Sequence, residues 1–312
     1  MRKAFPLLIV LFLTAPVFGQ RLQPYERLAD TVLQHQVIAF LADDACKGRA
    51  SGTEGCATAA GYIVRQFRDA GLNPLDWVYT QSFRYRDSIT LRNVVGVLNA
   101  TRPTDEYIVI MAHYDHLGEL GGTIYNGADD NASGVAALIS LARMFKALQN
   151  DGLGPQKNLV FVALDGKELD SAGSRYLADN LNIPRKKVTC VLNIDIFGSD
   201  LVPVWRNRYY LIALGEESLP YRYQGFLQGI CTRPGSKMDL DLSFYGSRDF
   251  TRMMYRSGDH AVFAERGYPA LFLTSGFHEH TYKATDDPQI INYAVLQRRT
   301  VVLFHFINAL CQ

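Results

Sequence analysis

Short apolar runs alternate with amphipathic segments along most of the chain. The runs have the length of buried strands and lie at residues 92–98, 107–111, 158–164, 188–194 and 270–274. Helical periodicity is found at residues 25–42, 57–70, 135–148, 172–181 and 289–309. Strands that alternate with helices at this spacing predict an α/β fold: a single domain with three layers, α/β/α, around a mixed, mainly parallel central sheet.

Two segments carry finer expectations. In the first helix, residues 25–42, the apolar face is expected to contain Leu28, Val32, Val37 and Leu41. Residues 200–255 are irregular and aromatic, and we expect one strand, one helix and loops there.

The N-terminus predicts an exported protein. Arg2 and Lys3 precede an apolar stretch, residues 6–17, that is too short to span a bilayer, and Val17 and Gly19 stand three and one residues before the expected cut ahead of Gln20. We therefore expect a signal peptide at residues 1–19 and a domain at residues 20–312 that is periplasmic or extracellular and has no membrane anchor. Without Arg2 and Lys3 the formal charge falls from +1 to −1, which gives no argument for binding nucleic acid or a membrane surface.

The cysteines do not form a zinc-binding pattern. No C-x-x-C spacing occurs among Cys46, Cys56, Cys190, Cys231 and Cys311. Export permits a disulfide, and Cys46 and Cys56 are the closest pair in sequence, but the pairing stays open. Cys190 lies in an apolar strand pattern and is expected in the core.

Metal-binding chemistry is indicated by four residues that follow consecutive predicted strands. They are His113, Asp130, Glu168 and Asp195. One such residue is usually a local hydrogen-bond partner, but carboxylates buried together without partners are costly. A divalent cation removes that cost, and carboxylate oxygens with an imidazole suit zinc, with manganese or cobalt as rivals.

These residues stand in motifs that resemble a known family. The motifs include A-H-Y-D, G-A-D-D-N-A-S-G, D-G-K-E-L-D-S-A-G-S-R-Y, N-I-D-I-F-G, S-G-D-H-A-V-F and T-S-G-F-H-E-H-T-Y-K-A-T-D-D, and they cover nearly the whole exported chain. In order and spacing they resemble the zinc-dependent aminopeptidases of the bacterial leucyl aminopeptidase type. That superfamily also contains glutamate carboxypeptidases and glutaminyl cyclases.

The resemblance implies a role for each matching residue. His113 and Asp195 would bind one metal ion, Glu168 would bind another, and Asp130 would bridge the two. Asp115 would orient His113 from behind. The resemblance also implies a cis peptide between Asp130 and Asn131. Residues near a substrate pocket would be Asp259, His260 and His278, although Asp259 equally fits the N-cap of a helix.

Two residues depart from the family pattern. Where the family has a glutamate that serves as general base, this chain has Lys167, directly before the ligand Glu168. Where the family has a histidine ligand of the second metal, this chain has Tyr282, whose phenol is a poor ligand at neutral pH. His280 can replace that histidine only if its loop shifts.

These departures leave the metal count and the role of Lys167 open. The resemblance implies one or two zinc ions, and the changed residues favour one. We hypothesise that the Lys167 ammonium replaces the charge of the second ion by pairing with Glu168 and Asp130. The alternatives are that two metals favour neutral Lys167 as a base, or that Lys167 points to solvent.

The sequence thus favours an exported metal-dependent exopeptidase that removes N-terminal residues from a peptide substrate, with activity impaired at Lys167 and Tyr282. The alternative is a non-catalytic peptide-binding protein of the same fold. A glutaminyl cyclase is less favoured, because that branch depends on the metal site that is altered here.

Overall fold

A mixed sheet forms the centre of the protein. The structure, a computed structural model, describes residues 22–202 and 207–312; the predicted signal peptide, residues 1–19, lies outside the described residues. The sheet contains β1 (Asn73–Pro74), β2 (Thr80–Tyr85), β3 (Ile89–Leu98), β4 (Tyr107–His113), β7 (Asn158–Leu164), β8 (Val188–Ile194), β9 (Tyr210–Leu214), β10 (Asp239–Asp241) and β11 (Ala270–Thr274). A separate hairpin is made of β5 (Gly118–Leu120) and β6 (Thr123–Tyr125).

The strand order brings the predicted site strands together. The order is β1-β3-β7-β4-β8-β11-β9-β10, and β2 also pairs with β3. The central strands β7, β4, β8 and β11 are parallel, whereas β3 and β9 join them antiparallel. Strands β4 and β7 are buried along almost their whole length, which explains why they appear as continuous apolar runs. The predicted fold class is confirmed.

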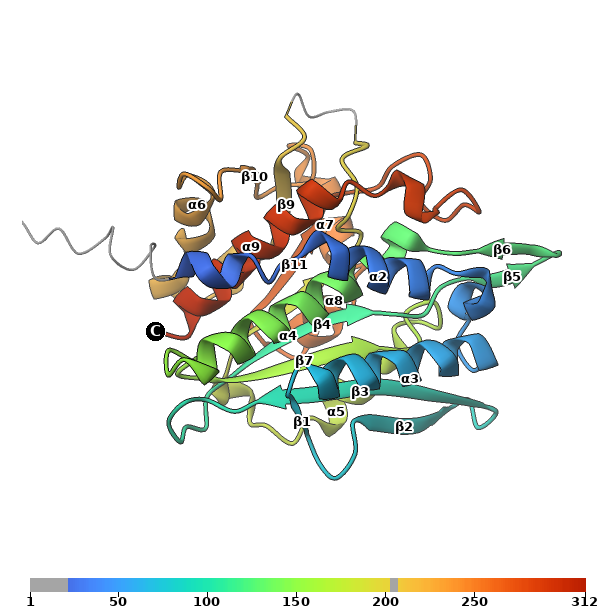
Figure 1. The fold of residues 1–312 in the computed structure, drawn as a ribbon, viewed down its shortest axis with the longest axis horizontal. Helices are drawn as coiled ribbons and strands as arrows, with labels where there is room; N and C mark the ends of the chain where they lie inside the picture. Colours follow the sequence, from blue (N-terminus) through green and yellow to red (C-terminus); the bar gives the residue numbers. More distant parts are fainter. Residues whose placement is uncertain (1–21, 203–206) are drawn as a thin grey trace, which may run out of the picture.

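Helices cover both faces of the sheet. They are α2 (Thr31–Leu41), α3 (Glu54–Asp69), α4 (Gly134–Asn150), α5 (Ala172–Asn180), α6 (Phe226–Cys231), α7 (Arg248–Tyr255), α8 (His260–Glu265) and α9 (Tyr293–Leu310). The larger core packs α2, α3, α4 and α9 on the near face in Figure 1, and a smaller core packs α5 and α8 on the other. Over the described ranges, none of the helices combines the length and hydrophobicity needed to span a membrane.

The first predicted helix differs from the observed structure. The chain is helical at residues 22–26, turns, and begins α2 afresh where the Asp30 carboxylate accepts a hydrogen bond from the Val32 amide. The restart rotates the buried face, so that Leu28 and Val32 are exposed while Val37 and Leu41 are buried. The predicted apolar face was therefore wrong in its first half.

Residues 200–255 also hold more structure than expected. Their described part contains two strands, β9 and β10, and two α-helices, α6 and α7. The sequence analysis expected one of each. Strand β10 is only three residues long and its side chains are partly exposed, so it lacks the apolar run that marks a buried strand.

The cysteines are all free thiols and all buried. The pairing of Cys46 with Cys56, left open above, is not observed. The Cys46 thiol donates to the Phe40 carbonyl at 3.3 Å, and the Cys56 thiol lies 3.5 Å from an Asp165 carboxylate oxygen. Cys190 lies in the core, as expected.

A buried arginine ties the segments around the carboxyl end of β4. The Arg49 side chain is fully buried, and its guanidinium donates to the backbone carbonyls of Leu41, Tyr114, Asn126 and Gly127. These carbonyls belong to the end of α2, the residue after β4 and the segment before residue 128. Because guanidinium presents its donors in a rigid fork, one side chain fixes three segments.

We expect Arg49→Met to lower the free energy of unfolding by about 3–5 kcal/mol, because the change leaves buried carbonyls without donors. Urea unfolding followed by circular dichroism measures the loss. The matched control, Arg102→Met at an exposed position, should change stability by less than about 0.5 kcal/mol. Equal effects of the two variants would contradict the structural role of Arg49.

Candidate metal centre

The candidate site lies at the carboxyl ends of parallel strands. His113 is the last residue of β4, Asp195 directly follows β8, and Glu168 lies four residues after β7. Asp130 comes from the helical turn Ala128–Ser133 that precedes α4. Parallel strands in an open α/β sheet present their carboxyl ends at one edge, which is where ligands gather in such folds. The four residues singled out from the sequence are thus on the same edge of the sheet.

Three of them form a compact group of buried donors. The Nε2 atom of His113 lies 3.3 Å from Asp130 Oδ1 and 3.2 Å from Asp195 Oδ1, and all three side chains are buried. With metal–ligand distances of about 2.1 Å, two ligands of a tetrahedral zinc lie roughly 3.4 Å apart. The observed spacing therefore fits a zinc ion.

The electrostatics of this group also favour a positive ion. Burial disfavours the charged form of His113, but Asp195 and Asp130 outweigh it and raise the pKa of the imidazole well above its ordinary value. Burial likewise opposes ionisation of Asp130, but His113 and His116 hold the pKa of that carboxyl below its ordinary value. Two buried carboxylates thus draw positive charge to one point, which a divalent cation supplies.

A second donor group includes a histidine that the sequence analysis did not assign. His116, Asp130 and Glu168 each place one ligand atom within 4.8 Å of the others. His116 Nδ1 lies 3.9 Å from Asp130 Oδ2. Burial lowers the pKa of His116 to about 4, so its ring is neutral. Burial, followed by the charge of Asp130, raises the pKa of Glu168 to about 7.

Several buried atoms of this group have no hydrogen-bond partner. They are Asp130 Oδ2, Glu168 Oε1 and the two ring nitrogens of His116, of which Nδ1 is the one given near Asp130. Buried polar atoms in folded proteins nearly always have hydrogen-bond partners, so several buried atoms without partners in one place indicate that a ligand binds there. Carboxylate oxygens and imidazole nitrogens are the donors that zinc takes. The residues present therefore fit the metal that the resemblance implied.

Asp115 supports the site differently from the role predicted for it. Its carboxylate accepts the backbone amides of Lys167 and Glu168, each at 3.1 Å, and the hydroxyl of Ser51 at 3.0 Å. The closest partner of His113 Nδ1 is the Asp115 backbone carbonyl at 3.1 Å, whereas the nearer carboxylate oxygen is 3.8 Å away. The Asp115 side chain therefore positions the segment that carries Glu168.

The Asp130 loop is held from several sides. The Asp286 carboxylate accepts the amides of Asp129 and Asp130 at 2.8 and 3.0 Å. Asn131 donates to the Ile194 carbonyl and accepts from the Ile196 amide. The peptide bond between Asp130 and Asn131 is cis, as the resemblance implied.

Lys167 is partly buried beside the ligands. In the part of the chain that the structure describes, no carboxylate oxygen forms an ion pair with its ammonium nitrogen within 4.0 Å. The structure thus shows no direct ion pair with Glu168 or Asp130, although the Lys167 charge acts to lower the pKa of both carboxyls; its role in place of the second ion stays a prediction. Burial disfavours the charge, but Asp259 and Asp195 outweigh it and raise the pKa of Lys167. The ammonium thus stays charged and unpaired beside the donor groups.

His278 and His280, the two histidines in the loop of Tyr282, belong to neither donor group. The Tyr282 ring is 47% exposed and lies 6.5 Å from the His116 ring, nearly parallel to it. His278 Nε2 lies 3.0 Å from Asp129 Oδ2, and His280 Nδ1 lies 2.8 Å from Thr285 Oγ1. The structure therefore gives no support to His280 as a ligand, and the ligand role of Tyr282 stays a prediction.

Asp259 and His260 are fully buried. Asp259 occupies the N-cap position of α8, but its side chain makes no capping bond; it accepts the Ser174 hydroxyl at 2.8 Å. The His260 ring packs against Tyr255 and Phe272, at 4.7 and 4.8 Å. Burial lowers the pKa of His260 to about 3, so the ring is neutral. Their placement in a substrate pocket stays a prediction.

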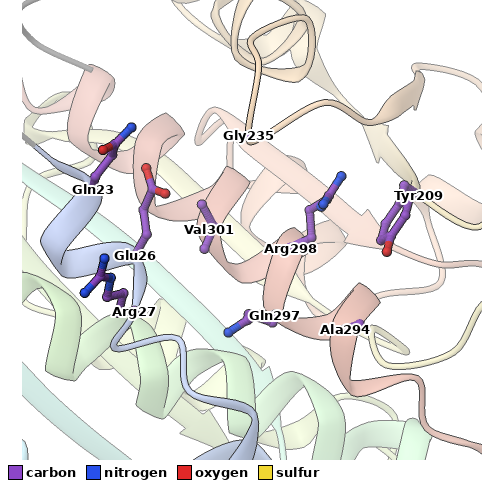
Figure 2. A pocket seen from close by; sticks show the side chains of 9 residues that line it. All are labelled: Gln23, Glu26, Arg27, Tyr209, Gly235, Ala294, Gln297, Arg298 and Val301. Carbon is purple, nitrogen blue, oxygen red and sulfur yellow. The ribbon is translucent and has the colours of Figure 1, made fainter. Parts of the chain in front are cut away.

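Figure 2 shows a different hollow, between α9 and the segment before α2. It has a volume of about 420 Å³, and its walls include Glu26, Arg27, Tyr209, Gln297, Arg298 and Val301. Glu26 is already paired with His305 at 2.8 Å, and the Arg298 guanidinium stacks on Tyr209. With one engaged carboxylate and no histidine in its walls, this pocket is not a metal site.

A buried group of imidazole and carboxylate donors at the edge of a three-layer α/β/α domain defines a metal-binding protein of the zinc-hydrolase class. The chain belongs to peptidase family M28, whose sequence model matches residues 93–307. Curated relatives include a probable zinc metalloprotease of Pyricularia oryzae, 27% identical over 61% of this chain and 41% of the relative. Human transferrin receptor protein 2 is 29% identical over 37% of this chain and 14% of its own length. The chain spans about half or less of the curated relatives it matches.

Solved structures share the fold over nearly the whole chain. LapB from Legionella pneumophila has a TM-score of 0.73 at 20% identity and covers 93% of this chain and 75% of its own. BSAP, a zinc aminopeptidase from Bacillus subtilis, has a TM-score of 0.71 at 14% identity, with 89% and 94% covered. A glutaminyl cyclase of Porphyromonas gingivalis has a TM-score of 0.66 at 18% identity, with 90% and 99% covered.

We expect Asp115→Asn to destabilise the site. An asparagine presents one acceptor and two donors where three donors point at the Asp115 carboxylate, so at least one amide loses its partner. The free energy of unfolding should fall by about 1–3 kcal/mol, measured by urea unfolding without metal. The exposed control Asp87→Asn should stay within about 0.5 kcal/mol of the parent protein. An unchanged stability in Asp115→Asn would refute the support role.

Proposed function

We propose that the protein is an exported, zinc-dependent exopeptidase of the aminopeptidase type that hydrolyses N-terminal peptide bonds slowly. One observation carries the proposal: in a buried group, His113 Nε2 lies 3.3 Å from Asp130 Oδ1 and 3.2 Å from Asp195 Oδ1. Membership of family M28 and similarity to zinc metalloproteases support the metal and the reaction class. The export follows from the predicted signal peptide at residues 1–19.

The ligands would be His113, Asp130 and Asp195. Bound zinc supplies a Lewis acid that polarises the scissile carbonyl and lowers the pKa of water. The chain's own residues fix the geometry. Asp115 holds the backbone that carries Lys167 and Glu168.

The slow rate follows from Lys167. An ammonium group has no lone pair, so it cannot accept the proton that a carboxylate at this position would take from water. General acid–base catalysis contributes about 10²–10⁴-fold to the rate. A site with the metal ligands but without this base should therefore hydrolyse peptides well below the rate of a complete one.

A second candidate is a non-catalytic peptide-binding protein with the same metal site. The charged, unpaired Lys167 favours it, and so does similarity to a protein named as a receptor. The two candidates predict different peptidase activities for the Lys167→Glu variant, in which a carboxylate base is restored. Glutaminyl cyclase activity should be assayed as well, because one structural neighbour is a glutaminyl cyclase.

We expect the zinc-loaded protein to cleave aminoacyl-p-nitroanilides slowly, to lose this activity in a chelator and to regain it with zinc. Lys167→Glu should raise kcat on the order of 10²-fold, since it restores a carboxylate at the base position. Lys167→Met, which removes the charge without adding a base, should give no such gain. Initial rates at saturating substrate, with zinc content measured in parallel, provide the readout.

Three results separate the candidates. Zinc-loaded wild-type and Lys167→Glu proteins that are both inactive would favour the peptide-binding protein, and calorimetric titration with peptides would then measure binding. A fast wild type that is slowed by Lys167→Glu would show that the lysine itself is catalytic, against the proposal. A chain without bound zinc would overturn both candidates.

A further inference from the structure

We propose that His116, with Asp130 and Glu168, forms a second cation site, and that His116 replaces the histidine lost at Tyr282. The proposal rests on the proposed function, since Asp130 would also bind the ion held by His113 and Asp195. It changes the expected metal count from one to two.

The fold places the His116 ring at this point. His116 lies three residues beyond His113, and its backbone amide donates to the Arg49 carbonyl at 3.2 Å. Gly127 has a φ of 57°, and a Cβ atom there would lie 2.6 Å from two atoms of the His116 ring. Only glycine combines this backbone with the space that the imidazole occupies.

The donor atoms around His116 need a ligand. Neither ring nitrogen has a partner, and the same holds for the carboxylate oxygens Asp130 Oδ2 and Glu168 Oε1. A buried polar group that lacks a partner destabilises the folded protein. A water molecule can satisfy some of these atoms, but it brings no charge to balance Asp130 and Glu168. A divalent cation does both.

Tyr282 lies close enough to His116 for His116 to take over the ligand role that the family assigns to the position of Tyr282. Its ring lies nearly parallel to His116, with 6.5 Å between ring centres. Burial, and next the charge of Asp130, raises the pKa of its phenol, which keeps it neutral. A neutral phenol is a weak zinc ligand, whereas the neutral imidazole of His116 is a good one.

The experiment counts zinc in the full chain. The metal-free protein is titrated with zinc by calorimetry, and bound zinc is measured by mass spectrometry after dialysis. We expect two ions per wild-type chain and one per chain in His116→Gln, with affinity at the second site lowered by at least about 100-fold. Removing a residue that only hydrogen-bonds to a metal ligand lowers metal affinity by about 10–100-fold, and removing a ligand itself should cost at least as much. His116→Phe keeps a ring beside Gly127 and should also bind one ion.

His280→Gln is the matched control, because it removes an imidazole from the loop of Tyr282 and should leave two ions. Two ions in both His116 variants, or one ion in the wild type, would overturn the inference while the first site stands. Loss of one ion in His280→Gln would assign the ligand to the loop instead. No zinc in the wild type would defeat the proposed function itself.

X-ray absorption gives a test that does not depend on the variants folding. Spectra of the wild type are recorded at one and two zinc equivalents. The second equivalent should add an imidazole scatterer at about 2.0–2.1 Å. A second equivalent coordinated by oxygen alone would overturn the inference.

Discussion

Acidic residues at one edge of the sheet divide into two groups by their partners. Three of them, Asp115, Asp129 and Asp286, accept backbone amides and so fix the loops around the site. The other three, Asp130, Glu168 and Asp195, accept no backbone amide in the described part of the chain. His113 pairs with Asp130 and Asp195, but one imidazolium balances only one of the three negative charges, so a cation stabilises this group. The first group supplies the rigid frame that keeps those ligands together.

The convergence of the site was predictable because it depends on topology. The apolar runs marked β4, β7 and β8, and neighbouring parallel strands bring their carboxyl ends to one edge, so His113, Glu168 and Asp195 had to approach each other. The break in the first helix was harder to predict. Its cause is a single side-chain bond from Asp30, and an aspartate inside a helical pattern is not by itself a boundary.

The direction of individual side chains beyond the strand ends could not be read from the sequence. His116 was present in the run H-Y-D-H, and its spacing of three from His113 was a usable signal, but its contact with Asp130 depends on how the chain bends after β4. Lys167 stands out in the sequence as a substitution, yet the charges that surround its ammonium group, those of Asp259 and Asp195 first, depend on the tertiary fold. Secondary structure follows periodicity, whereas such contacts follow tertiary packing.

Charge balance decides how the two cation sites compare. A lysine in place of a glutamate raises the local charge by two units, as much as one divalent ion. At the first site Asp130 and Asp195 both face the ion, and their negative charge offsets the nearby ammonium. The second site has Glu168, whose pKa of about 7 shows a weaker hold on its charge, and it shares Asp130 with the first. The first ion should therefore bind more tightly, and Lys167 should weaken the second without removing its ligands.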